Sequence, residues 1–152
     1  MKAMEDLGAY LMMRLLIDPY QDTEALQAEF MGTYYGAAAP KMQEYLDCII
    51  KRQFAWKTPL GAVPSSQWDF LDVEFFNTVY KLIGEAEVLV KDDPKRLERV
   101  RTEYIPTNSA ILLQWRPLAA RGLKLDRDRV VNQMQEASEN ALKRFRPRPK
   151  TV

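Results

Sequence analysis

The sequence predicts an all-α protein, an antiparallel bundle of about six helices. Apolar residues recur three or four positions apart in most segments, as they do along one side of an α-helix. Proline, glycine and aspartate stand between these segments, where helices begin and end. Sustained alternation of apolar and polar residues, which is typical of strands, is missing apart from a short extended piece near residues 57–64.

The composition fits one folded domain and excludes several kinds of function. The chain has 152 residues, of which 47% are hydrophobic and 28% are charged, enough apolar surface for a core. It has no histidine, which excludes Ser-His-Asp and Cys-His triads and histidine-containing zinc sites. A single cysteine, Cys48, excludes intrachain disulfides and cysteine-only metal clusters. The net charge of +1 argues against a general nucleic-acid binder.

The first two helices have clear ends. The first covers about residues 3–17 and ends at Asp18-Pro19, because a residue before proline is disfavoured in the α region. Asp22 is the expected N-cap of the second helix, and Gly36 the residue that follows its last turn. Its apolar side consists of Leu26, Phe30 and Tyr34.

Two longer helices flank the only convincing loop. Pro40 suits the first turn of the third helix. Residues 57–66 are rich in proline, glycine and serine and predict a loop, after which Ser66 or a neighbour caps the fourth helix. The inward positions of the two helices are Met42, Tyr45, Leu46, Ile49, Ile50, Phe54, Phe75, Val79, Leu82, Ile83, Ala86 and Val90.

A proline interrupts the fifth helix. Asp93 is its predicted N-cap and Pro94 its first residue. Pro106 then kinks or splits the helix, since it lacks a backbone donor and crowds the preceding turn.

The C-terminal part ends in a basic tail. Residues 116–122 predict a turn, and Asp126 or Asp128 then caps the last helix. We expect residues 1–142 to form the bundle and residues 143–152 a basic, proline-containing, disordered tail. The tail has five bases and no acid, which suits an anionic partner, but solvated ends of this kind are common.

Residues 7–17 are apolar but do not predict a signal peptide or a membrane span. Two acids precede the stretch, Arg14 interrupts it, and no small-residue cleavage site follows. About 20 residues are needed to cross a bilayer. The stretch therefore predicts a core helix, and we expect no membrane partner; the sequence sets no compartment.

No catalytic residue is assigned. Asp69, Asp72 and Glu74 lie among aromatic residues, the setting of a glycosidase carboxylate pair. On a helix Asp69 and Asp72 would be neighbours, whereas a catalytic pair flanks the scissile bond from opposite sides. Acids in a first helical turn are also expected from the helix dipole.

No metal or cofactor site is predicted either. Glu85, Glu87, Asp92 and Asp93 lack the alternating spacing and the glycine of a calcium loop. Cys48 lies in an apolar stripe without an evident base, which predicts a buried, unreactive thiol.

Aromatic residues at helix ends are the candidate ligand-binding residues. Tyr34, Tyr35, Trp56 and Trp68, with Asp69, bracket helix ends and the long loop. Flat rings at a rim bind sugars by stacking. The alternative is that the rings close the end of the bundle.

Several segments together resemble a known family. The run from Leu7 and Tyr10 through Leu15-Leu16-Ile17-Asp18-Pro19-Tyr20-Gln21-Asp22, then Phe30, Tyr34-Tyr35-Gly36-Ala37-Ala38-Ala39-Pro40 and Tyr45-Leu46, is similar to the helical C-terminal region of bacterial α-glucuronidase-like proteins, a domain of unknown function. Glu85-Ala86, Asp93-Pro94 and Arg99-Val100 fit its second half. The likeness covers about residues 7–115, most specifically 14–46. Ile17 stands where that pattern has a tryptophan, which weakens a sugar contact there.

The resemblance implies that the helices follow a (β/α)₈ barrel whose strand ends carry the catalytic acids. The chain would then be a non-catalytic accessory domain that packs against this barrel and lines a saccharide cleft. The parent of such a domain is often exported. Activity does not transfer with the fold.

Two other functions stay open. A tetratricopeptide-like interaction scaffold is indicated by the helix–Asp-Pro–helix unit at residues 80–104, although no second copy follows at a fixed period. A small stand-alone enzyme is disfavoured by the missing histidines and phosphate loop.

Overall fold

The computed structural model describes residues 3–56, 68 and 70–145. Over these residues it has eight α-helices, one 3₁₀ turn and no strand, so the all-α prediction is confirmed. The elements are α1 (Glu5–Ile17), α2 (Thr23–Tyr35), η1 (Gly36–Ala38), α3 (Ala39–Ala55), α4 (Val73–Leu89), α5 (Pro94–Thr102), α6 (Tyr104–Leu113), α7 (Trp115–Ala120) and α8 (Arg127–Phe145).

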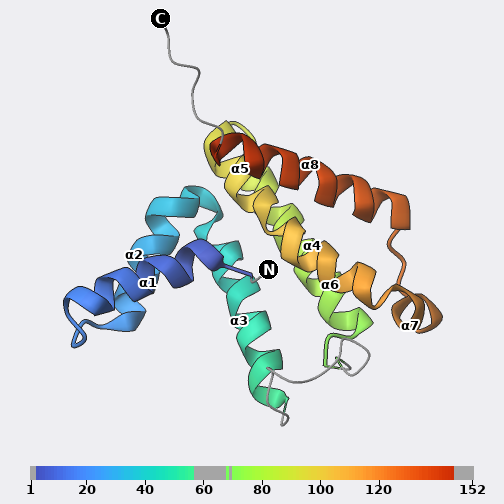
Figure 1. Ribbon diagram of the computed structural model, residues 1–152, viewed down its shortest axis with the longest axis horizontal. Helices are drawn as coiled ribbons and strands as arrows, with labels where there is room; N and C mark the ends of the chain where they lie inside the picture. The colour runs from blue at the N-terminus through green and yellow to red at the C-terminus, as the bar shows by residue number, and fades with distance from the viewer. Residues whose placement is uncertain (1–2, 57–67, 69, 146–152) are drawn as a thin grey trace, which may run out of the picture.

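The helices form a body with an arm (Figure 1). In the body α3 packs along α4, and α8 packs along α6 and α5. The arm is the pair α1 and α2, which extends to one side of the body. Within the arm α1 packs mainly on α2, while α2 also contacts α3 and α5. One side of α1 therefore has no helix of the described chain against it.

Aspartates begin the helices at most of the predicted places. Asp22 caps α2 by accepting hydrogen bonds from the amides of Glu24 and Ala25. Asp93 caps α5 in the same way, and Pro94 is the first residue of that helix. Of the two alternatives for α8, Asp126 is the cap. These carboxylates satisfy amides that have no partner within the helix.

The cap of α4 was predicted wrongly. Ser66 and the loop at residues 57–66, with its extended piece near 57–64, lie outside the described residues. The helix begins at Val73, and the Asp72 carboxylate accepts from the Phe75 amide at 2.8 Å. Asp72 has the capping role that was predicted for Ser66, and it lies six residues nearer to the first buried side chains of α4.

Residues 116–122 contain a short helix in place of the predicted turn. Helix α7 begins at Trp115, so Pro117 is its third residue. The amides of a first helical turn have no partner inside the helix, and a proline there removes no hydrogen bond. Gly122, with φ near +90°, follows the helix.

The split at Pro106 is confirmed and falls three residues earlier. Helix α5 ends at Thr102 and α6 begins at Tyr104. Pro106 has no N–H for the Thr102 carbonyl, and its ring crowds that oxygen, so the helix breaks one turn before the proline. Glu103 lies at the break and is buried.

Apolar side chains from every part of the fold make one core. Its largest fully buried members are Tyr35, Tyr45, Phe76, Met42, Ile83, Ile111, Leu118, Val79, Val100 and Val130. These include predicted inward positions of α3 and α4. Phe54 was also predicted to point inward, yet 87% of its surface is exposed, because it lies in the last turn of α3 beyond the core.

Phe76 and Phe54 provide a direct comparison of buried and exposed rings. Phe76 has no exposed surface, so Phe76→Ala should lower the free energy of unfolding by about 3–5 kcal/mol through lost burial and a cavity. Phe54→Ala should change it by less than about 0.5 kcal/mol. Urea denaturation of the two variants measures both values. Equal losses would contradict the placement of the core.

Candidate functional site

The two predicted tyrosines belong to the packing of the arm. The Tyr34 ring stacks on Phe30 with ring centres 4.7 Å apart, and the Arg99 guanidinium lies 4.0 Å from its centre. Arg99 also donates to the Tyr34 carbonyl oxygen at 2.7 Å, and the Tyr34 hydroxyl donates to Asp6. Tyr35 is 1% exposed, so its ring offers no surface to a ligand in this conformation.

The predicted tryptophans lie far from the tyrosines. Trp56 directly follows α3, where its ring packs against Phe70 at 4.7 Å between centres. Trp68 is half-buried, and Asp69 lies outside the described residues. Tyr35 precedes α3 and Trp56 follows it, and a helix of 17 residues is about 25 Å long. The structure therefore does not bring the predicted residues into one site, and their ligand-binding role stays a prediction.

The described carboxylates near Trp68 have structural partners. Asp72 caps α4 and accepts from Arg52 at 2.9 Å, and Glu74 is 3.4 Å from the same guanidinium. Arg52 thereby ties the end of α3 to the start of α4. Among the described residues, no second acid is paired with either carboxylate across a cleft.

Other kinds of site are also missing from the part of the chain that the structure describes. No group of three or more cysteine, aspartate or glutamate side chains there could hold a metal ion. None of the described helices combines the length and apolar character that crossing a membrane requires. Cys48 is partly buried, and this burial raises the pKa of its thiol, which disfavours the reactive thiolate.

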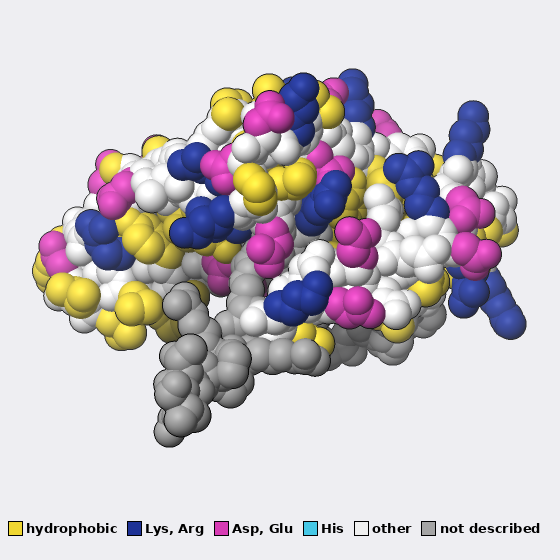
Figure 2. Space-filling model, turned by 90° about the horizontal axis from the view of Figure 1, so that it is seen from above, with side chains coloured by type: hydrophobic (Ala, Val, Ile, Leu, Met, Phe, Trp, Pro, Cys, Tyr) yellow, Lys and Arg dark blue, Asp and Glu magenta, His cyan; other side chains and the backbone are white. Residues whose placement is uncertain are grey.

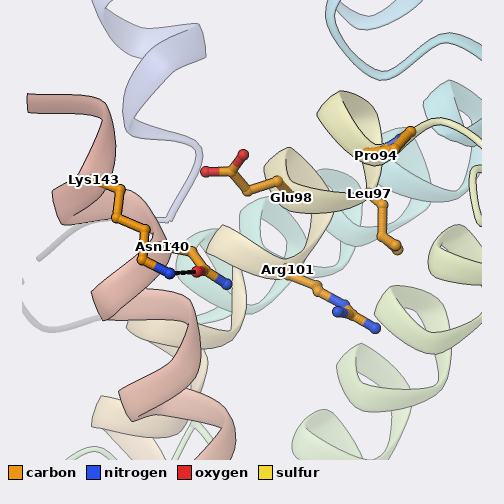
Figure 3. A pocket seen from close by; sticks show the side chains of 6 residues that line it. All are labelled: Pro94, Leu97, Glu98, Arg101, Asn140 and Lys143. Atoms are coloured by element: carbon orange, nitrogen blue, oxygen red, sulfur yellow. Dashed lines mark hydrogen bonds between the residues drawn. The ribbon is translucent and has the colours of Figure 1, made fainter. Parts of the chain in front are cut away.

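A groove with a volume of about 480 Å³ lies between α5 and α8 (Figure 3). Lys143 donates to Asn140 at 2.9 Å on the α8 side, and Glu98 lies across the groove on α5. Its charges are of both signs, and Arg101 is bound by Glu87 at 2.6 Å. Among the described residues that line the groove, none is a nucleophile with an adjacent base.

The most unusual group in the fold is Glu103, which the sequence did not single out. Its side chain is buried, and its Oε2 atom accepts from the Met4 amide at 3.1 Å and the Tyr45 hydroxyl at 3.4 Å. Oε1 accepts from the Tyr35 hydroxyl at 3.4 Å. Tyr45 in turn lies 3.2 Å from the Thr107 hydroxyl. One carboxyl thus joins the N-terminal segment, α2 and α3 to the α5–α6 break.

Burial governs the chemistry of this carboxyl. Loss of contact with water raises the pKa of Glu103 to about 7, although hydrogen bonds from Met4, Tyr45 and Tyr35 favour the charged form. The same burial raises the pKa of both tyrosines well above the usual value, so the two hydroxyls remain donors. The charge of Glu103 accordingly changes near neutral pH.

Only one local signal pointed to Glu103. A proline predicts a helix break about one turn before it, and an acid three residues before Pro106 therefore falls at the break. Its partners come from residues 58 to 99 positions away along the chain. No spacing rule connects such distant residues.

The fold and site define an all-α helical domain in which the described residues show no assembled catalytic group. Residues 1–47 match the model of a family described as "Domain of unknown function (DUF4838)". No curated protein and no solved structure matches the chain. The match covers α1, α2, η1 and the first half of α3. It includes residues 14–46, where the resemblance to a domain of unknown function is most specific.

The buried carboxyl makes stability depend on pH. A carboxyl of pKa about 7 in the folded state and about 4.5 in the unfolded state stabilises the fold fully below pH 4.5. The contribution is lost as the pH rises through 7, and it amounts to about 3 kcal/mol. Urea denaturation of the protein at pH 5 and pH 8 should show this decrease.

Glu103→Gln is the matched variant, because an amide keeps the size of the side chain and cannot ionise. Its free energy of unfolding should change much less between pH 5 and pH 8. A decrease as large as that of the unchanged protein would show that other groups cause the pH dependence.

Proposed function

We propose that the chain is a non-catalytic accessory domain of a carbohydrate-active, glycoside-hydrolase-like protein, and that it packs against a (β/α)₈ barrel through helix α1. The observation that carries the proposal is an apolar surface on the outer side of α1. The resemblance described above supplies the barrel as the partner.

This surface, the α1 ridge, consists of large apolar side chains with 62% to 94% of their surface exposed: Met12, Met13, Leu16, Ile17 and Tyr20. Met12 and Leu16 are four residues apart, as are Met13 and Ile17, so their side chains form two adjacent rows on one side of the helix. Figure 2 shows hydrophobic side chains gathered at the end of the molecule where α1 and α2 lie. Contiguous exposed apolar surface marks an interaction site.

The opposite side of α1 packs against the core. Leu7 is buried in the core, and Tyr10 and Leu11 pack against it. A helix that is apolar on both sides fits between two layers of protein. Helix α2 is one layer, and the helical outer ring of a barrel would be the other.

Charges around the ridge support a particular kind of partner surface. Between Arg14 and Lys41 the sequence has four acids, Asp18, Asp22, Glu24 and Glu29, and no Lys or Arg. Glu29 is 3.4 Å from Arg14, which balances one of them. The matching face of the barrel would combine an apolar centre with basic residues at its edge.

The proposed sugar-binding role is limited to one of the predicted aromatic residues that the structure describes. Tyr35 is buried in the core, and Tyr34 contacts Phe30, Asp6 and Arg99. Trp68, half-buried at the end of the body where α4 begins, is the described residue that we propose for a saccharide cleft.

A protein-interaction scaffold is the alternative function. The predicted unit at residues 80–104 corresponds to α4 and α5, with Asp93 and Pro94 between them. An ion pair between Glu87 and Arg101, 2.6 Å apart, links the two helices. A scaffold would act without the barrel.

Methionine oxidation tests whether the ridge is covered in the native protein. In the isolated chain, dilute hydrogen peroxide should oxidise the exposed Met12 and Met13 much faster than the buried Met31 and Met42. In the polypeptide recovered from source cells with an antibody against this chain, oxidation of Met12 and Met13 should slow at least about tenfold. Peptide mass spectrometry measures each sulfoxide.

Two exposed leucines supply the variant and its control. Leu16→Glu places a charge on the ridge and should restore fast oxidation of Met12 and Met13 in the native polypeptide. Leu142→Glu makes the same change on α8 and should not. A native band at 17.7 kDa on an immunoblot, with both methionines oxidised quickly, would reject the barrel and favour the scaffold.

A further inference from the structure

The N-terminal segment closes the pocket that holds Glu103. Met4 is 5% exposed, its amide donates to Glu103, and its sulfur accepts from the Tyr35 hydroxyl at 3.4 Å. Leu7 continues this cover into the core. We propose that Glu103 is a pH-sensitive clasp: when its carboxyl loses its proton, the segment from Met4 to Leu7 opens and frees the start of α1 from the body.

Burial favours the neutral acid of Glu103 over the anion, and this effect outweighs the hydrogen bonds, which favour the anion. The donors to Glu103 are a backbone amide and two hydroxyls, none of them charged. At the start of α1, the Met4 amide and the Asp6 carboxylate face Glu103. On α2 the Tyr35 hydroxyl faces it, and Tyr34 lies behind Tyr35. The Tyr45 hydroxyl on α3 and the Thr107 hydroxyl on α6 complete the set. Asp6 carries the same charge as ionised Glu103 and repels it.

A buried anion with no cation beside it is relieved by contact with water. Water reaches Glu103 most easily on the side of the pocket that has the fewest packing contacts with the rest of the protein. Tyr35 and Tyr45 are fully enclosed by the core, whereas α1 packs mainly on α2 and has the exposed ridge on its other side.

The backbone of Met4 also favours opening there. Its φ of 53° and ψ of 39° lie in the left-handed region, which is strained for a residue with a side chain. The hydrogen bond to Glu103 keeps the residue in this conformation. Release of Met4 would remove the strain and hydrate the carboxylate in one movement.

The clasp acts on the arm and leaves the body closed. It would change how firmly α1, and with it the ridge, is attached as the pH passes through 7. This inference goes beyond the proposed function and holds whether or not a barrel covers the ridge.

Hydrogen–deuterium exchange measured on the whole chain at pH 6 and pH 8 tests it. After correction for the intrinsic effect of pH on exchange, opening at residues 4–8 should increase at least about tenfold at pH 8. Opening at residues 79–83, in the buried part of α4, should also increase with the global loss of stability but stay much rarer than opening at residues 4–8 at both pH values. Equal opening at the two places would mean that the start of α1 opens only by global unfolding and would overturn the clasp.

Three variants separate ionisation from a loss of packing. Glu103→Gln should keep the low exchange of residues 4–8 at both pH values. Glu139→Gln makes the same chemical change on the exposed side of α8 and should behave like the unchanged protein. Tyr34→Phe removes the hydrogen bond to Asp6, a contact of the arm that does not include the Glu103 side chain, and should raise exchange by a similar factor at pH 6 and pH 8.

The unchanged protein alone gives a second measurement. The midpoint of the increase in exchange along a pH series should lie near 7. A series without an increase at residues 4–8, or an unaltered increase in Glu103→Gln, would overturn the proposal.

Discussion

A buried carboxyl group determines how the two parts of this protein are joined. Glu103 receives hydrogen bonds from the N-terminal segment, from α2 and from α3, while it lies itself at the break between α5 and α6. Each of these bonds crosses from the arm or α3 to the C-terminal half. The break that turns Glu103 inward follows from the backbone chemistry of Pro106, three residues further on. A local constraint in the sequence thus creates a long-range junction.

The helices could be predicted because their signals are local. A cap, a proline and a 3–4 spacing act within one or two turns, and this holds for Asp22, Asp93 and Pro106. Errors arose where two local signals competed. Ser66 and Asp72 could both begin α4, and residues 116–122 predicted a turn although Pro117 suits the first turn of a helix. Which signal begins the helix depends on where the buried core begins, and local sequence signals do not determine that.

The site was harder to predict for the same physical reason. The aromatic residues chosen as ligand-binding candidates are separated by α3, and Tyr35 is enclosed by the core. The apolar stretch at residues 7–17 predicted a core helix, which is correct for the side of Leu7 but not for that of Ile17. Composition does not tell which of two apolar sides stays uncovered. The junction holds the start of α1, and the ridge lies on the same helix, so the junction determines how firmly the ridge is attached to the body.

The most direct test of this account is the titration of Glu103 itself. Carbon-13 NMR of the glutamate side-chain carboxyls, with Glu103→Gln to assign the signal, gives its midpoint without reference to stability. The account predicts a midpoint near 7, together with chemical-shift changes at the Met4 amide over the same pH range. A midpoint near 4.5, the ordinary value for glutamate, would mean that water reaches the carboxyl and that the junction does not form as described.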